Sequence, residues 1–199
     1  MSLRELKMER TRILIAETAL ALFRDKGFAA TTVEEIAAAA EVGARTVYRH
    51  YPTKESLALS GFAVTFEIGL NDLRACPEDT EIPEVLRVVL ASLLRSHTER
   101  SEQLLTAYKI AESTPSVLAQ LVYLLQTWQN DLAREVAARL GGRSADLLAE
   151  LAVRQLGSLF IVAIRKWVES DGRAGLRQLT VEALDLVRSN AVPVASRLS

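Results

Sequence analysis

An apolar pattern that repeats every three to four residues constrains the fold of this chain more than any other feature. Its longest uninterrupted example comprises Leu118, Leu121, Leu125, Trp128, Leu132 and Val136. This spacing places the apolar side chains on one face of an α-helix. Similar stripes follow one another along the chain, and no segment alternates apolar and polar residues as a half-buried strand does. The sequence therefore predicts an all-α fold of about nine helices.

The composition supports a soluble helical protein. Hydrophobic residues make up 49% and charged residues 25% of the 199 residues, and Gly and Pro are scarce. The one cysteine, Cys76, excludes an intramolecular disulfide framework and suits a reducing compartment. The first residues lack the apolar core of a signal peptide, and the most apolar run, 156–164, is too short to cross a bilayer. We therefore expect a cytoplasmic protein with no membrane partner.

Two short helices near the N-terminus form a recognisable arrangement. The first, over 31–40, begins at two threonines that are each followed three residues later by a glutamate, which is a capping box. After a break of three residues, the second helix runs over 44–51 and stops at Pro52. Helices this short need a packing partner, which the apolar stripe of a helix over 13–26 supplies. The layout is that of a helix-turn-helix.

The second short helix carries chemistry suited to DNA. Val47 and Tyr51 lie one turn apart and are expected to face the core, whereas Arg45 and Arg49 share another face. The formal net charge of the whole chain is −1, so any basic patch is local. Arginine can pair with guanine in the major groove, and nearby hydroxyl and ammonium groups can bind phosphates. Taken without its neighbours, the same helix face could simply be solvated.

The residues around this helix carry a family resemblance. The segment TTVEEIAAAAEVGARTVYRHYPTKESL, residues 31–57, resembles the DNA-binding signature of TetR-type transcriptional regulators. The upstream residues Ile15, Ala19, Phe23, Gly27 and Phe28 match that family pattern too. The resemblance covers roughly residues 10 to 60. Two positions depart from it, since Glu41 stands where the family usually has glycine and Gly43 where it often has Ser or Thr.

The resemblance implies specific DNA contacts. It assigns phosphate contacts to Thr32, Tyr48, His50 and Lys54, base contacts to Ala44, Arg45 and Thr46, and either kind to Arg49. Residues 1–55 are then a DNA-binding domain, and 56–199 a helical domain for ligand binding and dimerisation. Glu41 would repel phosphate, so we expect it to face away from DNA.

A DNA reader of this kind needs two copies, because one recognition helix contacts too few bases for specificity. The run 156–164 is apolar almost all round, as in a helix that is buried on two sides. We expect helices 144–170 and 174–189 to form a homodimer interface, as the resemblance implies. The alternative is a core formed within one chain.

The middle helices are expected to hold an effector pocket, as the resemblance implies. Candidate lining residues are Phe62, Phe66, His97, Tyr108 and Tyr123, which place aromatic and polar groups among apolar neighbours. The alternative is that they are ordinary packing residues, the role that we assign to Trp128 and Trp167. The effector would be an apolar or amphipathic small molecule that shifts the helix over 54–75 and so changes the spacing of the two recognition helices.

Other classes of function find little support. The sequence has no glycine-rich phosphate loop, no H-E-x-x-H and no G-x-S-x-G, and two histidines are too few for a histidine-rich metal site. We therefore expect no enzyme activity, no cofactor and no metal. The remaining alternative is a helical ligand- or protein-binding adaptor that does not bind DNA. The most consistent prediction is a ligand-responsive repressor that acts as a dimer on a palindromic operator.

Overall fold

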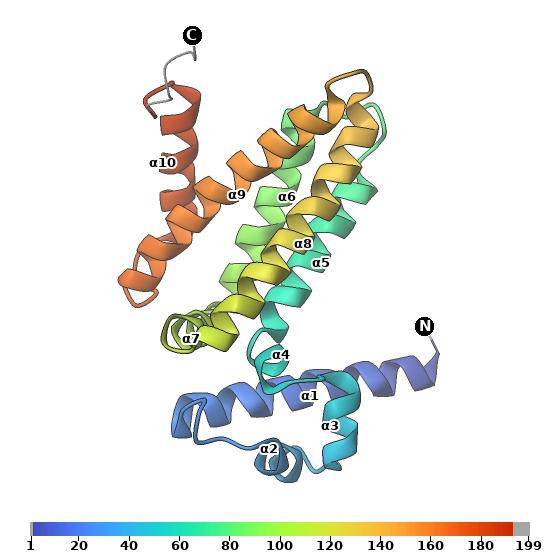
Figure 1. Cartoon of the computed structure of the whole chain (residues 1–199), viewed down its shortest axis with the longest axis vertical. Helices are drawn as coiled ribbons and strands as arrows, with labels where there is room; N and C mark the ends of the chain where they lie inside the picture. Colours follow the sequence, from blue (N-terminus) through green and yellow to red (C-terminus); the bar gives the residue numbers. More distant parts are fainter. Residues whose placement is uncertain (1, 193–199) are drawn as a thin grey trace. The chain divides into compact units, whose positions relative to one another are not determined.

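The fold is entirely helical in the part of the chain that the structure, a computed structural model, describes, residues 2–192 (Figure 1). Within that part there are ten helices and no strand: α1 (Leu3–Lys26), α2 (Val33–Ala39), α3 (Ala44–His50), α4 (Lys54–Ala58), α5 (Ser60–Ala75), α6 (Ile82–Glu99), α7 (Ser101–Ser113), α8 (Pro115–Leu140), α9 (Ala145–Glu169) and α10 (Leu176–Arg188). The prediction of an all-α fold is confirmed.

Packing divides the chain into two compact units. Among the described residues, the first unit comprises 2–66 together with Glu102–Gln126, and the second comprises Glu67–Ser101 together with 127–192. Helices α5 and α8 each contribute residues to both units. The functional division between residues 55 and 56 stays a prediction.

Helix α1 supports the rest of the first unit and begins earlier than the sequence indicated. Ser2 is its N-cap and forms a capping box with Glu5, so the helix starts ten residues before the predicted 13–26. Ile15 and Phe23 are buried in the core. The helix ends at Gly27, whose φ of 87° suits glycine and whose N–H donates to Phe23 O at 3.0 Å.

The helix-turn-helix is formed by α2 and α3, close to the predicted bounds. Thr32 is the N-cap of α2, and its hydroxyl accepts from the Glu35 N–H at 3.2 Å. Gly43 is the N-cap of α3 and gives no side-chain cap. Val47 and Tyr51 are buried, and the Tyr51 hydroxyl donates to Arg12 O at 3.1 Å. Their predicted packing role is confirmed, and α3 is thereby fixed to α1.

The helix predicted over 54–75 is interrupted at one residue. Helix α4 ends at Ala58 and α5 starts at Ser60. Leu59 between them is the C-cap of α4, and its N–H donates to the carbonyls of Glu55 and Leu57. The apolar pattern continues across this point without a proline, so no local signal indicates the interruption.

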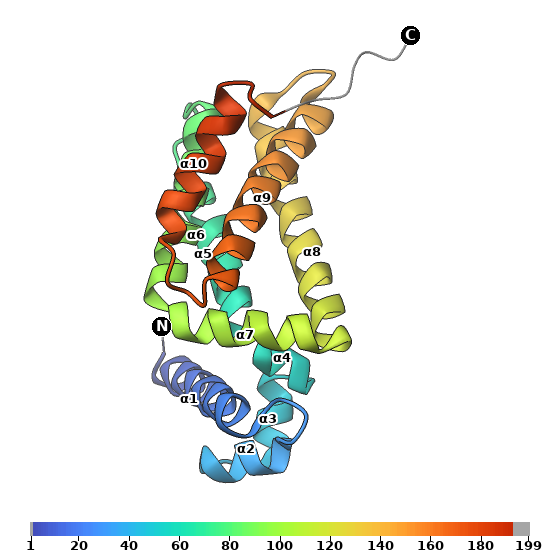
Figure 2. The ribbon, with the colours of Figure 1, turned by 90° about the vertical axis from the view of Figure 1, so that its left-hand side faces the viewer.

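The second unit is built from α6, α9, α10 and the ends of α5 and α8. His97 on α6 is buried and meets the Phe160 ring of α9 edge-on, with ring centroids 5.1 Å apart. Arg139 donates to the carbonyls of Leu73, Cys76 and Pro77 at 2.8–3.1 Å, which satisfies the C-terminal end of α5. Helices α9 and α10 run antiparallel and in contact (Figure 2).

Helix α9 is the most apolar helix of the described chain. By length and composition it could span a bilayer, with a mean hydropathy of 1.8 over its most apolar 18-residue window, of which 44% is buried. The core helix of a soluble protein has the same properties. Val153, Phe160 and Trp167 pack into the second unit, so one face of α9 belongs to the protein core.

Candidate nucleic-acid interface

The outward face of α3 carries the residues expected to touch DNA. Arg45, Tyr48 and Arg49 are exposed, and Ala44 and Thr46 are half-buried. Neither arginine forms an ion pair with any residue between 2 and 192. An exposed cation without an internal partner retains all its donors for a ligand. The solvated-face and DNA-binding interpretations share this geometry, and the residue set and its spacing favour DNA.

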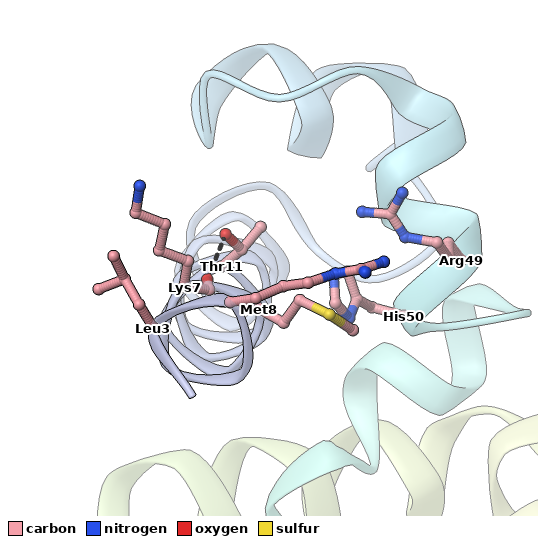
Figure 3. Close-up of a pocket in the computed structure, with 7 residues that line it drawn as sticks. Leu3, Lys7, Met8, Thr11, Arg49 and His50 are labelled. Carbon is pink, nitrogen blue, oxygen red and sulfur yellow. Dashed lines mark hydrogen bonds between the residues drawn. The ribbon is translucent and has the colours of Figure 1, made fainter. Parts of the chain in front are cut away.

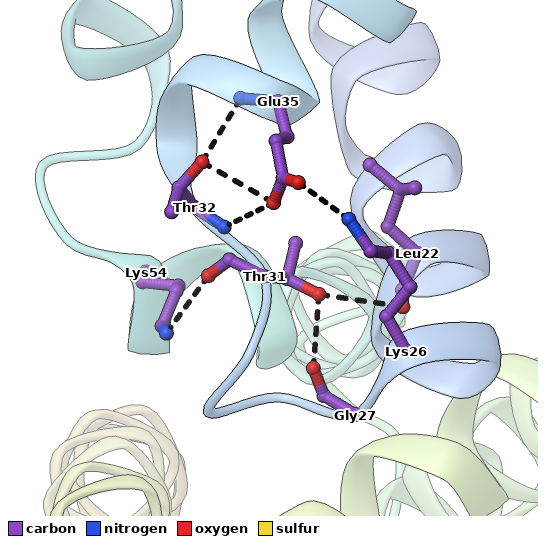
Figure 4. A network of polar contacts seen from close by, with 7 residues as sticks. All are labelled: Leu22, Lys26, Gly27, Thr31, Thr32, Glu35 and Lys54. Carbon is purple, nitrogen blue, oxygen red and sulfur yellow. Dashed lines mark hydrogen bonds and ion pairs between the residues drawn. The ribbon is translucent and has the colours of Figure 1, made fainter.

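Thr32 occupies the N-terminal end of α2 in a closed network (Figure 4). Its N–H donates to the Glu35 carboxylate at 2.9 Å, completing the capping box, and Lys26 forms an ion pair with the same carboxylate. The Lys26 ammonium is the main cause that lowers the pKa of Glu35, followed by the backbone N–H of Thr32. The network fixes Thr32, which stays exposed, at the start of the helix.

Lys54 has partners inside the first unit. Its ammonium donates to Phe28 O at 2.8 Å and to Thr31 O at 3.0 Å, and it lies 4.4 Å from the centroid of the Phe28 ring. The link between Lys54 and Thr31 is drawn in Figure 4. An ammonium has three donors, so one remains for a phosphate. Lys54 therefore joins α4 to the loop before α2, a role that the sequence did not indicate.

His50 lies at the end of α3 beside the N-terminal part of α1 (Figure 3). Its Nε2 is shielded from solvent and has no hydrogen-bond partner. Burial is the first cause that lowers the pKa of His50, and the positive charges of Arg49 and Arg12 lower it further. The lowered pKa disfavours the charged imidazolium at this position.

The residues expected to bind an effector fall in different surroundings. In the first unit, the Phe62 and Tyr108 rings meet edge-on with centroids 4.6 Å apart, and Phe66 lies 6.3 Å from Phe62. In the second unit, the buried His97 donates from Nδ1 to Leu93 O at 2.8 Å. Burial lowers the pKa of His97 from 6.5 to about 4, so it is neutral at pH 7.

Tyr123 differs from the other candidate effector residues, because 70% of its side chain is exposed. A side chain on the outer surface of α8 cannot line an interior pocket in this conformation. Trp128 and Trp167, by contrast, are buried as the predicted packing residues should be.

Helices α9 and α10 leave an apolar surface uncovered. Each of the exposed residues is 45–63% exposed: Leu147, Leu148, Leu151, Ile161 and Val162 on α9, and Val181 and Leu186 on α10. Exposed apolar residues that gather on one surface often mark a site of protein–protein interaction.

Two family models match the chain and together cover most of it. The model described as "Bacterial regulatory proteins, tetR family" matches residues 15–60, and that described as "MftR C-terminal domain" matches residues 80–191. The transcriptional regulator TcmR of Streptomyces glaucescens is 34% identical in an alignment of 172 residues that covers 83% of this chain and 73% of TcmR.

Solved structures share the fold at lower identity. The repressor FadR of Thermus thermophilus, in complex with lauroyl-CoA, is 24% identical with a TM-score of 0.56, and the match covers 94% of this chain and 98% of FadR. FadR of Bacillus subtilis, in complex with stearoyl-CoA, is 17% identical with a TM-score of 0.60, covering 88% and 96%. At these identities the two structures support the fold alone.

Proposed function

Because the chain belongs to the TetR family of bacterial regulatory proteins, we propose that it is a ligand-responsive repressor that binds an inverted-repeat operator as a homodimer. We further propose that this DNA-binding transcriptional regulator acts in the cytoplasm and has no catalytic role.

One observation carries the DNA-binding part of the proposal. Helix α3 is fixed to the core by the buried Val47 and Tyr51, while Arg45 and Arg49 are exposed and form no ion pair with the described residues 2–192. A rigid helix that presents unpaired arginines is suited to the major groove, where Arg45 would pair with guanine N7 and O6. Ala44 and Thr46 would contact neighbouring bases, and Tyr48 and Thr32 would bind phosphates.

The dimer is proposed to form through α9 and α10. Their uncovered leucines, isoleucine and valines lie on two contacting antiparallel helices, and a second copy of the same pair would bury them in a four-helix interface. Sedimentation of the purified protein as a monomer at micromolar concentration would contradict this assembly.

The effector is proposed to be an apolar or amphipathic small molecule. The aromatic cluster of Phe62, Phe66 and Tyr108 supports an apolar site in the first unit, and His97 offers a buried polar group in the second. Long-chain acyl-CoA is the class to test first, because the two FadR repressors with this fold bind lauroyl-CoA and stearoyl-CoA. An effector acts only to the extent that it binds one conformation better than another.

Fluorescence anisotropy with labelled DNA from upstream of the gene tests the function. The wild type should bind this duplex in excess competitor, and Arg45→Ala should lose ~1–3 kcal/mol of discrimination between bases. Arg134→Ala is the matched control, because Arg134 is an exposed arginine of the second unit. Equal binding of all three proteins to any duplex would reject base reading by Arg45, and no DNA binding at all would favour the adaptor alternative.

A further inference from the structure

The first turns of α1 form a basic hollow together with the end of α3. Its volume is about 480 Å³, and it is lined by Leu3, Arg4, Lys7, Met8, Thr11, Arg49 and His50. Figure 3 shows Lys7, Met8 and Thr11 on one side and the α3 residues on the other. Arg4, Lys7 and Thr11 are spaced by three and four residues, so they lie along one face of α1. The hollow thus collects cations from two helices that are far apart in sequence.

The charges of this hollow are not neutralised within residues 2–192. Arg4, Lys7 and Arg49 are exposed, and none of them forms an ion pair with another residue of that range. The nearby acids are engaged elsewhere. Glu5 accepts from the Ser2 N–H at 2.7 Å, and Glu9 accepts two hydrogen bonds from Arg12 at 2.8 and 2.9 Å. The local surface is therefore positive in a chain whose net charge is −1.

We propose that Arg4 and Lys7 form a second DNA contact, which binds the phosphodiester backbone beside the phosphates that His50 and Arg49 reach. The hollow is continuous with the proposed interface because Arg49 and His50 belong to both. Duplex DNA complements it in charge and supplies phosphates at regular intervals next to the groove that α3 enters. Residues 3–14 lie outside the matched range of the family model, which begins at residue 15.

This inference rests on the proposed DNA binding, and the test separates the two. The probe is the duplex that the wild type enriches from a random pool, with Kd measured across salt concentrations. Each phosphate contact contributes about 0.9 to the slope of log K against log salt, so Arg4→Ala/Lys7→Ala should reduce the slope by about 3.6 for a dimer. Raising the salt from 50 to 200 mM weakens binding of both proteins, and the factor by which Kd rises should be roughly 100 times smaller for the variant than for the wild type. Base preference and melting temperature should stay unchanged, since both side chains are exposed.

Two controls decide the interpretation. Arg4→Lys/Lys7→Arg keeps both charges and should retain the wild-type slope. Arg134→Ala/Arg143→Ala removes the same charge from the second unit and should leave the slope within about half a unit of the wild type. A slope that the Arg4 and Lys7 variant does not change, while Arg45→Ala still loses base preference, overturns this inference and leaves the proposed function standing. An equal reduction of the slope in Arg134→Ala/Arg143→Ala also overturns this inference. Failure of the wild type to enrich any duplex overturns both the inference and the proposed function.

Discussion

Removal of the Lys54 ammonium should destabilise the DNA-binding module as well as weaken DNA binding. Lys54→Met keeps an unbranched apolar side chain of similar length and deletes the ammonium that lies over the Phe28 ring and its two hydrogen bonds to the carbonyls of Phe28 and Thr31. A hydrogen bond to a charged group contributes ~1.5–3 kcal/mol when it is shielded, and a cation over an exposed ring about 0.5–1 kcal/mol. Lys54 is half-buried and water can reach the freed carbonyls, so we expect a net loss of about 2 kcal/mol.

Thermal unfolding measured by circular dichroism checks this value. For a chain of this size, 2 kcal/mol corresponds to a fall in melting temperature of about 4–8 °C. Lys166→Met is the control, because the ammonium of Lys166 forms an exposed ion pair with Glu169 and has no other partner in the described part of the chain. This substitution should change the melting temperature by about 2 °C or less. If Lys54→Met has the melting temperature of the wild type but a slope of log K against log salt that is smaller by about 0.9 per subunit, Lys54 binds phosphate and does not stabilise the loop before α2.

Three further predictions, at Glu41, Gly157 and His97, are tested by chemical denaturation. Glu41→Gly should stabilise the protein by about 0.5–1 kcal/mol, because Glu41 has a φ of 55° that glycine adopts without steric strain; a destabilised variant would contradict this. Gly157→Ala should lower the free energy of unfolding by about 1–3 kcal/mol, because its Cβ would lie 2.0 Å from the Nε2 of the buried Gln129. In the control Gly69→Ala, the Cβ meets atoms at 3.6–3.7 Å, so this substitution should be neutral or stabilising. Equal effects of the two substitutions would refute the close approach of Gln129 to Gly157. The pKa of His97 is about 4 in the folded state and 6.5 in the unfolded state, so the unfolded state binds the proton first as the pH falls. The free energy of unfolding should therefore decrease by about 3 kcal/mol between pH 6.5 and 4. His97→Asn should remove this decrease, and a variant with the same pH dependence as the wild type would contradict the role of His97.

The sequence predicted the helix-turn-helix well because its boundaries depend on local signals. Threonine and glutamate cap α2, Gly27 ends α1, and Pro52 follows α3, all within a few residues of the element they limit. The packing of Val47 was equally accessible, since helical spacing decides which side faces the core.

Other features depended on contacts that spacing does not reveal. The pattern Ser2 to Glu5 is itself a capping box and could have indicated the early start of α1, but the first turns carry no buried stripe. The partners of Lys54 lie 23 and 26 residues away, and their position is set by the loop conformation after Gly27. The exposure of Tyr123 depends on how α8 is rotated in its packing, which an apolar stripe fixes only within a wide arc.

Selection of bound duplexes from a random pool tests the central claim most directly. If α3 of each subunit enters the major groove of B-form DNA, the enriched duplexes should contain an inverted repeat whose half-site centres are about 34–36 Å apart or a multiple of that distance. Arg45→Ala should enrich the same spacing with relaxed preference at one position of each half-site. A pool that shows no enrichment at moderate ionic strength, or enrichment of single sites without symmetry, would contradict a paired reading of DNA by this chain.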